Sequence, residues 1–387
     1  MNTKNTTHRP FFDGKFKGLW DSIKNSPYPL HYTLRWPWYF KNPSVRNHSG
    51  MQPNNDKYNI SISDCTDKGH ENSLKLLFAG DIMVLNGDKA PVLCTELCDL
   101  ISSSNLFIAN LEAPLGDHKP VLDKKYAFRF HMPREFLLDI QQQIGLPFEQ
   151  WVLTNANNHS GDMGIDGFNT SINLLESLGV NHVGHRDFTS PFRIIENNGF
   201  RISVAGWTHW LNRDLNTGIQ PVITPSDIHN VDVNRFKQQN NLDFVIGLPH
   251  WEFEFQHFPR KGTRTLGKNF SEIGFDLLVG SHPHVLQPYE RFSDTFCFYS
   301  LGNFCGLGVA KPVKIIPILE LNLVKSENEE ASVKNFSIHY FYQLHQGDSI
   351  SIVPLEEVPC DVKSLAESRI SKVMKRNQTS IGDTRAC

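Results

Sequence analysis

Side chains that can bind a metal ion or transfer a proton follow five short apolar stretches, each at the point where a predicted strand ends. The stretches run into Asp81 and into residues 110–112, 155–159, 250–254 and 282–284. Because sites in open α/β sheets form just beyond the carboxyl ends of the strands, we expect these side chains to meet. Carboxylates combined with imidazoles suit Mn, Fe or Zn, whereas carboxylates alone would indicate Mg or Ca. The sequence therefore predicts a site for one or two divalent metal ions.

The strongest local signal is the pair His282 and His284, separated by Pro283. In an extended segment, the alternation of side chains would direct both imidazoles to the same side, and the proline would hold that geometry by fixing φ. Each motif alone has a structural explanation. A glycine followed by an aspartate such as Asp81 is typical of a turn, and a lone histidine is more often structural than catalytic. The occurrence of all five motifs, each at a strand end, favours a functional site.

The elements that must position these residues alternate between short apolar stretches and helix-like stretches. The helix over residues 168–178 is expected to end at Gly179, and the tail from residue 365 is expected to be helical. Strands that alternate with helices predict an α/β fold with a largely parallel or mixed sheet. The predicted strands cover residues 74–79, 106–109, 151–153, 202–205, 244–246, 277–279, 315–324, 333–342 and 350–353.

The overall composition is that of an ordinary globular protein. The 387 residues are 39% hydrophobic and carry a formal net charge of -3, which gives no global field that would attract nucleic acid. No stretch is long and apolar enough for a transmembrane helix, and the N-terminus has no apolar signal region. The seven cysteines include no CxxC pair, which indicates free thiols in a reducing compartment. We therefore expect a cytoplasmic protein that binds no nucleic acid.

The first 72 residues differ in composition from the rest. Residues 10–40 are dense in aromatic and basic side chains, and residues 41–73 are mostly polar. We expect an aromatic arm that packs on the main domain, followed by a linker. The alternative is an arm that docks on a partner or gives peripheral membrane association through residues 10–40. The predicted domains are an arm and linker (1–72), a main domain (73–355) and a C-terminal helix with a polar tail (356–387).

Several of these motifs appear in the order known from one family. They are Gly80-Asp81-Ile82-Met83, Asn110-Leu111-Glu112, Ala156-Asn157-Asn158-His159 with Asp162 and Gly164, His250-Trp251 with Glu254, Gly280-Ser281-His282-Pro283-His284-Val285-Leu286-Gln287-Pro288, and Tyr299-Ser300-Leu301-Gly302-Asn303-Phe304. Over residues 74–304 the chain resembles the CapA-type poly-γ-glutamate capsule synthesis proteins, a branch of the calcineurin-like metallophosphoesterases. The resemblance implies a four-layer α-β-β-α sandwich, here with an N-terminal extension.

The resemblance also implies a role for each matched residue. The metal ligands would be Asp81, Glu112, Asn158, His250, His282 and His284, with Glu112 as the candidate bridge between two ions. The catalytic residues would be His159, Asp162 and Glu254, with His159 as a general acid or phosphate-orienting group. Asn110 and Asn303 would contact the substrate.

Three positions depart from the wider superfamily or from the branch. Met83 stands where the superfamily has a histidine, and Glu112 stands where it has an aspartate. Glu252 stands where the branch has a glycine, so the access beside His250 is expected to be narrower or more acidic. Family members are also typically tethered to a membrane by an N-terminal segment, and this sequence shows none.

The preferred hypothesis is a metal-dependent hydrolase of the phosphoesterase type, linked to poly-γ-glutamate or capsule-type polymer synthesis. Its substrate would be phosphorylated or polyanionic, and a polymer-synthesis protein is a possible partner. A second hypothesis is a non-catalytic capsule-assembly or polyanion-binding component. A third is a γ-glutamyl amide-bond hydrolase that uses a metal-activated water.

Overall fold

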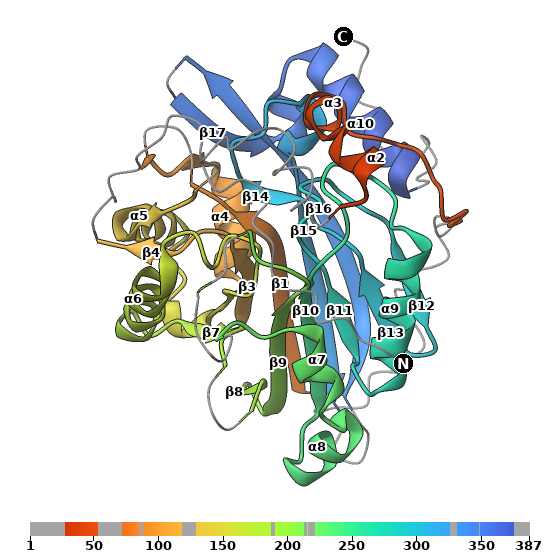
Figure 1. Cartoon of the computed structure of the whole chain (residues 1–387). Coiled ribbons are helices and arrows are strands. Elements are labelled where there is room, and N and C mark those ends of the chain that lie inside the picture. Colours follow the sequence, from red (N-terminus) through yellow and green to blue (C-terminus); the bar gives the residue numbers. More distant parts are fainter. Residues whose placement is uncertain are drawn as a thin grey trace.

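Two β-sheets packed face to face form the centre of the protein (Figure 1). The computed structural model describes residues 28–52, 72–84, 88–117, 129–186, 190–212, 215, 221–325, 331–347 and 349–374. The larger sheet has nine strands in the order β2-β17-β16-β15-β1-β3-β6-β7, with β14 also paired to β1. Its strands are β1 (Asn72–Ile82), β2 (Val92–Leu93), β3 (Leu106–Leu111), β6 (Trp151–Thr154), β7 (Asn181–Val183), β14 (Asn303–Cys305), β15 (Ile315–Lys325), β16 (Ser332–Gln346) and β17 (Ser349–Pro354).

The smaller sheet has six strands in the order β12-β13-β11-β10-β9-β8. They are β8 (Arg193–Asn197), β9 (Phe200–Thr208), β10 (Phe244–His250), β11 (Leu277–Val279), β12 (Tyr289–Phe292) and β13 (Thr295–Phe298). A separate pair consists of β4 (Leu115–Gly116) and β5 (Met132–Pro133). All nine stretches predicted as strands lie within observed strands, most of which extend a few residues further.

The α-helices lie on the outer sides of the sheets and near both of their ends (Figure 1). The predicted helix over residues 168–178 is α6, which begins earlier and ends before the left-handed Gly179. The helices are α2 (Leu30–Thr33), α3 (Trp36–Lys41), α4 (Thr95–Ser102), α5 (Arg134–Ile144), α6 (Gly164–Ser177), α7 (Pro225–His229), α8 (Val233–Gln239), α9 (Lys261–Glu272) and α10 (Cys360–Met374), with short 3₁₀ turns at Phe148–Gln150, Lys311–Lys314 and Leu355–Glu357.

The alternation of side chains along β1 explains the layers. Leu76 and Phe78 point into a core shared with the smaller sheet, where they meet residues such as Ile202 of β9. Leu77 and Ala79 point the other way, into a second core that includes buried side chains of α4, α5 and α6. Both faces of this strand are therefore buried, which fits its nearly continuous apolar sequence.

The smaller sheet is covered in the same manner on its outer face. Trp207 of β9 packs in a third core with Ile228 of α7, Val233 of α8 and Phe270 of α9. The order from one side to the other is helices, sheet, sheet, helices. The predicted four-layer α-β-β-α sandwich is confirmed.

The strands that carry the predicted site residues run parallel to their neighbours within each sheet. In the larger sheet, β1 pairs in parallel with β3, and β3 with β6. In the smaller sheet, β10 lies in parallel between β9 and β11. Their carboxyl ends therefore meet at one end of the sandwich. Here β14 joins β1 with Asn303 opposite Asp81, and Gly80 approaches the backbone of Gly302 so closely that any Cβ would overlap its carbonyl oxygen.

The N-terminal segment, defined here as residues 28–52, packs on the main domain as expected for the arm. Tyr28 and Tyr32 are buried against Phe253, although Trp38 stays 67% exposed. Residues 41–52, expected to begin a linker, also pack: Met51 is fully buried, and Ser44 bridges to Gln256. Residues 10–27 of the predicted arm and residues 53–71 of the linker lie outside the described residues, as does the tail beyond residue 374.

No helix in the described ranges has the length and apolar character needed to cross a membrane. The cysteines at positions 94, 98, 297 and 305 are free thiols, in agreement with the sequence-based prediction.

Candidate metal centre

The predicted metal-binding side chains converge at the carboxyl ends of the strands and are all buried. Ligand atoms of Asp81, Glu112 and His250 lie within 4.8 Å of one another, and so do those of Glu112, His282 and His284. Glu112 belongs to both groups, which is the arrangement expected of a carboxylate that bridges two ions. Asn158 joins the first group because its Oδ1 lies 2.8 Å from Nε2 of His250.

Oxygen Oε1 of Glu112 has no hydrogen-bond partner among the described residues, although it is buried. It lies 3.7 Å from Nε2 of His250 and 3.7 Å from Nε2 of His284. Burial, followed by the nearby charge of Asp81, raises the pKa of Glu112 well above its usual value. A buried carboxylate oxygen without a donor is costly, and a divalent ion between it and the imidazoles would satisfy it. The residues present therefore fit a metal ion.

Hydrogen bonds fix how His284 presents its ring. Its Nδ1 lies 3.1 Å from Oδ2 of Asp81 and 2.9 Å from Oδ1 of Asn303. Both partners accept, so Nδ1 carries a proton and Nε2 faces Glu112. Burial lowers the pKa of His284, but the contact with Asp81 outweighs it and the net shift is upward. Burial by itself raises the pKa of Asp81, but the contacts with His284, His250 and Asn110 together outweigh burial, and the net shift is downward.

His250 of the first ligand group lies next to His282 of the second. Nε2 of His250 lies 3.1 Å from Nδ1 of His282, and Nδ1 of His250 is held 2.8 Å from Oγ of Ser281. Burial lowers the pKa of His250 to about 3 and lowers that of His282 well below its usual value. Both imidazoles are therefore neutral at pH 7, which is the form that binds a metal.

The backbone of the His282-Pro283-His284 segment differs from the prediction. Both histidines have positive φ, 98° at His282 and 56° at His284, so the segment is bent rather than extended. The two rings still lie together, with centroids 5.9 Å apart. The expectation that the two imidazoles lie on the same side was right. The reason given for it, the alternation of side chains along an extended strand, was wrong. Non-glycine residues with positive φ are uncommon and concentrate at functional sites.

His159 stands outside both ligand groups. Its Nδ1 lies 2.7 Å from Oδ2 of Asp162, and the same oxygen accepts a 2.7 Å hydrogen bond from the backbone N–H of Phe130. Because a carboxylate oxygen accepts, Nδ1 carries the proton and the other ring nitrogen, Nε2, is directed away from Asp162. Asp162 thus orients His159, in the way that carboxylates orient catalytic imidazoles.

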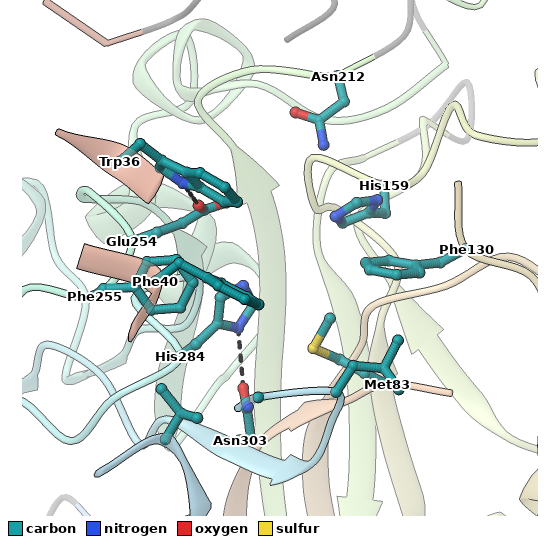
Figure 2. Close-up of a pocket in the computed structure, with 13 residues that line it drawn as sticks. Trp36, Phe40, Met83, Phe130, His159, Asn212, Glu254, Phe255, His284 and Asn303 are labelled. Carbon is teal, nitrogen blue, oxygen red and sulfur yellow. Dashed lines mark hydrogen bonds between the residues drawn. The ribbon is translucent and has the colours of Figure 1, made fainter. Parts of the chain in front are cut away.

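A pocket of about 730 Å³, including the part open to solvent, adjoins the cluster. Three of the predicted catalytic or substrate-binding residues, His159, Glu254 and Asn303, line it together with His284 (Figure 2). Asn110 does not line it. Instead its side-chain amide donates a 2.8 Å hydrogen bond to Oδ1 of Asp81 and so holds a ligand in place.

Glu252 does not make the access beside His250 more acidic. Its carboxylate accepts hydrogen bonds from the backbone N–H of Arg260 at 2.8 Å and from Nε of Arg260 at 2.5 Å. The carboxylate is buried, whereas the guanidinium side chain is 44% exposed. The negative charge is therefore paired. The expectation of greater acidity is wrong because the sequence gave no sign of the arginine partner eight residues later.

The N-terminal segment supplies contacts that motif analysis missed. The hydroxyl of Tyr28 lies 2.9 Å from Nε2 of His282, and Nε1 of Trp36 donates to Oε2 of Glu254. Trp36 and Phe40 line the pocket, as does Asn212, which no motif indicated. The density of aromatic residues near position 36 was a signal for packing but not for where the segment packs.

Two proteins of capsule synthesis are similar to part of this chain. A stretch of the PGA biosynthesis protein CapA of Bacillus subtilis (strain 168) is 31% identical over 161 residues, which is 40% of this chain and 42% of that protein. The capsule biosynthesis protein CapA of Bacillus anthracis is 30% identical over 164 residues, covering 40% of this chain and 39% of that protein. The matched stretches thus span about two fifths of either relative.

Among solved structures, a phosphatase from Mycoplasma pneumoniae aligns with 70% of this chain and 95% of its own at 14% identity and a TM-score of 0.43. The family model described as bacterial capsule synthesis protein PGA_cap matches residues 75–306, which include every residue of the cluster. That match covers more than half of the sequence, and the chain therefore belongs to the PGA_cap family of bacterial capsule synthesis proteins.

Proposed function

We propose that this protein is a metal-dependent hydrolase that cleaves phosphoesters at the cluster around Glu112. The observation that carries the proposal is the unpaired, buried Oε1 of Glu112, 3.7 Å from an imidazole nitrogen of His250 and of His284. Asp81, Asn158 and His282 would complete the ligand set. Carboxylate, amide and imidazole donors together favour Mn, Fe or Zn.

When bound, a divalent ion would act as a Lewis acid toward a phosphoryl oxygen and activate water at neutral pH. The residues of the chain itself would do the rest. In its doubly protonated form, His159 would donate the Nε2 proton to the leaving oxygen and keep the Nδ1 proton, while Asp162 would hold the ring in position. Asn303 and Glu254 line the pocket beside these groups and would orient the substrate.

The names of the Bacillus relatives support a link to poly-γ-glutamate or capsule synthesis, and we propose that the hydrolysis serves such a pathway. Two other functions are alternatives. In the first, the protein is a non-catalytic component that binds a polyanion. The other is hydrolysis of a γ-glutamyl amide bond by the same residues. Asp162 orients the ring of His159, which a protein that only binds a polyanion would not need. This favours the two hydrolase functions over the binding function.

The proposal is tested by metal analysis and turnover on one preparation. Protein purified without chelator should contain Mn, Fe or Zn, and with added Mn it should hydrolyse a generic phosphomonoester. Incubation with short γ-glutamyl peptides serves as the comparison. Release of glutamate without phosphoester turnover would favour the amide hydrolase, and an absence of bound metal after incubation with excess Mn would contradict the proposal.

One prediction concerns Tyr28, whose hydroxyl faces Nε2 of His282. A metal-binding histidine is usually oriented by a partner on its other ring nitrogen, and loss of such a partner typically costs about 10–100-fold in metal affinity. Tyr28→Phe removes only the hydroxyl. We expect it to weaken Mn binding by about tenfold, measured by isothermal titration calorimetry.

Tyr39→Phe provides a matched control because Tyr39 lies in the same segment and its ring stacks on Tyr32, 5.2 Å away, rather than on a site histidine. It should bind Mn like the wild type. Equal Mn affinities for the two variants would show that the hydroxyl of Tyr28 has no part in orienting His282.

A further inference from the structure

The pocket beside the cluster is apolar on most of its surface, which bears on the kind of substrate that it accepts. Seven of its lining residues are aromatic, aliphatic or thioether side chains, with polar ones gathered near the cluster. The rings of Trp36 and Phe40 stand on one side, and Phe130 and Met83 stand on the other (Figure 2). Pockets with an apolar lining and a few convergent polar groups typically bind small molecules.

The wall formed by α3 is held firmly. Trp36 stacks on Phe40 with ring centroids 5.5 Å apart, and each packs edge-on against Phe255 at 5.8 and 5.5 Å. The indole N–H of Trp36 donates to Oε2 of Glu254, which fixes the ring at the boundary between the apolar wall and the polar end. A flat apolar surface is therefore preformed beside His284 and His159.

The charges of the lining residues also favour an uncharged group in the pocket. Among the described residues that line the pocket, none is a lysine or an arginine, and Glu254 is a carboxylate. A second anionic group placed against Trp36 and Phe40 would lose its hydration, and no lysine or arginine of the described lining would pair with it, which is costly. A polyglutamate chain is poorly matched to this wall, whereas an uncharged ring or alkyl group is well matched.

We propose that the substrate is a phosphomonoester whose phosphate is attached to an uncharged aromatic or apolar group, and that Trp36 and Phe40 of the N-terminal segment select for that group. This inference rests on the proposed function, since the phosphate would be held at the cluster and the apolar group in the pocket. It narrows the substrate from any phosphorylated or polyanionic compound to one class.

The test compares the binding of phenylphosphonate, methylphosphonate and γ-linked triglutamate to the Mn-loaded full chain by calorimetry. The two phosphonates share the same head group and differ in the ring. We expect phenylphosphonate to bind at least about tenfold more tightly than methylphosphonate, because the ring leaves water for an apolar surface. Trp36→Ala and Phe40→Ala should each reduce this ratio severalfold.

Trp38→Ala is the matched control. Trp38 lies two residues from Trp36 on the same helix but is 67% exposed, so its loss should leave the ratio unchanged. Melting temperatures of all variants exclude general unfolding as the cause, and Phe40→Leu, which keeps an apolar side chain, should retain more of the preference than Phe40→Ala.

Equal binding of the two phosphonates by a wild type that binds Mn and hydrolyses a phosphomonoester would overturn the pocket inference alone. Tighter binding of triglutamate than of phenylphosphonate would also overturn it. Failure to bind Mn would instead overturn the proposed function, so the two failures are distinguishable.

Discussion

His159→Ala is expected to lower phosphoester turnover by about 10²–10⁴-fold while metal content stays close to that of the wild type. His159 belongs to neither ligand group, and its ring is oriented toward the pocket by Asp162, 2.7 Å away. Removing the ring deletes a proton donor and leaves Asp81, Glu112 and the three cluster histidines in place. Turnover and metal stoichiometry measured on the same sample check this separation.

Asp162→Asn should reproduce part of the defect, because the amide is uncharged and its NH2 group, where it faces Nδ1, favours the other tautomer of His159. If His159 had only a structural role, its replacement would lower stability and leave turnover unchanged. The backbone N–H of residue 159 donates a hydrogen bond to Oδ1 of Asn157, so the turn keeps this bond in the variant. A lowered melting temperature with unchanged turnover per folded molecule would identify His159 as a packing residue.

The second large effect is expected from His282→Ala, which should reduce metal content and turnover together. His282 is fully buried, and its Nδ1 points at His250. Since loss of a residue that only orients a ligand typically weakens metal binding about 10–100-fold, loss of a ligand itself should cost more than about 100-fold. Inductively coupled plasma analysis after dialysis, followed by turnover with excess Mn, measures both effects.

His339→Ala is a suitable control because His339 pairs with Glu320 on the larger sheet, away from the cluster. Its metal content should equal that of the wild type. Excess Mn should also raise the melting temperature of the wild type, since a ligand at 100 times its Kd stabilises the folded state by about 2.7 kcal/mol. A His282→Ala protein that is stabilised by Mn as much as the wild type would rule out His282 as a ligand.

Much of the fold could be predicted because burial leaves a strong pattern in the sequence. The continuous apolar run at the centre of β1 reflects a strand covered on both faces, and Asp81 near its carboxyl end is a polar side chain that is also fully buried. The same logic located Asp81, Glu112 and His250 at strand ends. Parallel pairing of β1 with β3 brings Asp81 and Glu112 together, and the alternation of strands and helices already indicated such pairing. His250 ends β10 of the smaller sheet and joins them because the two sheets pack face to face.

The parts that the sequence did not predict depend on contacts between distant segments. Tyr28 reaches His282 across 254 positions, and no local pattern encodes that distance. The left-handed backbone at His282 and His284 is imposed by tertiary packing, against the preference of non-glycine residues. The pairing of Glu252 with Arg260 likewise depends on a turn after β10 whose shape the residue types do not specify.

The position of β1 has a consequence for the order in which the chain folds. On one side β1 pairs with β3, which follows it closely in sequence, as Leu76 opposite Leu106 shows. On the other side it pairs with β15, where Leu74 lies opposite Leu323. During synthesis this second edge stays open until β15 and β16 emerge, and open edges recruit other chains. Closing so long a loop also makes the last step slow. During refolding, the late addition of β15 to β1 therefore competes with association between chains. Because association depends on protein concentration, dilution should increase the yield of the native sheet.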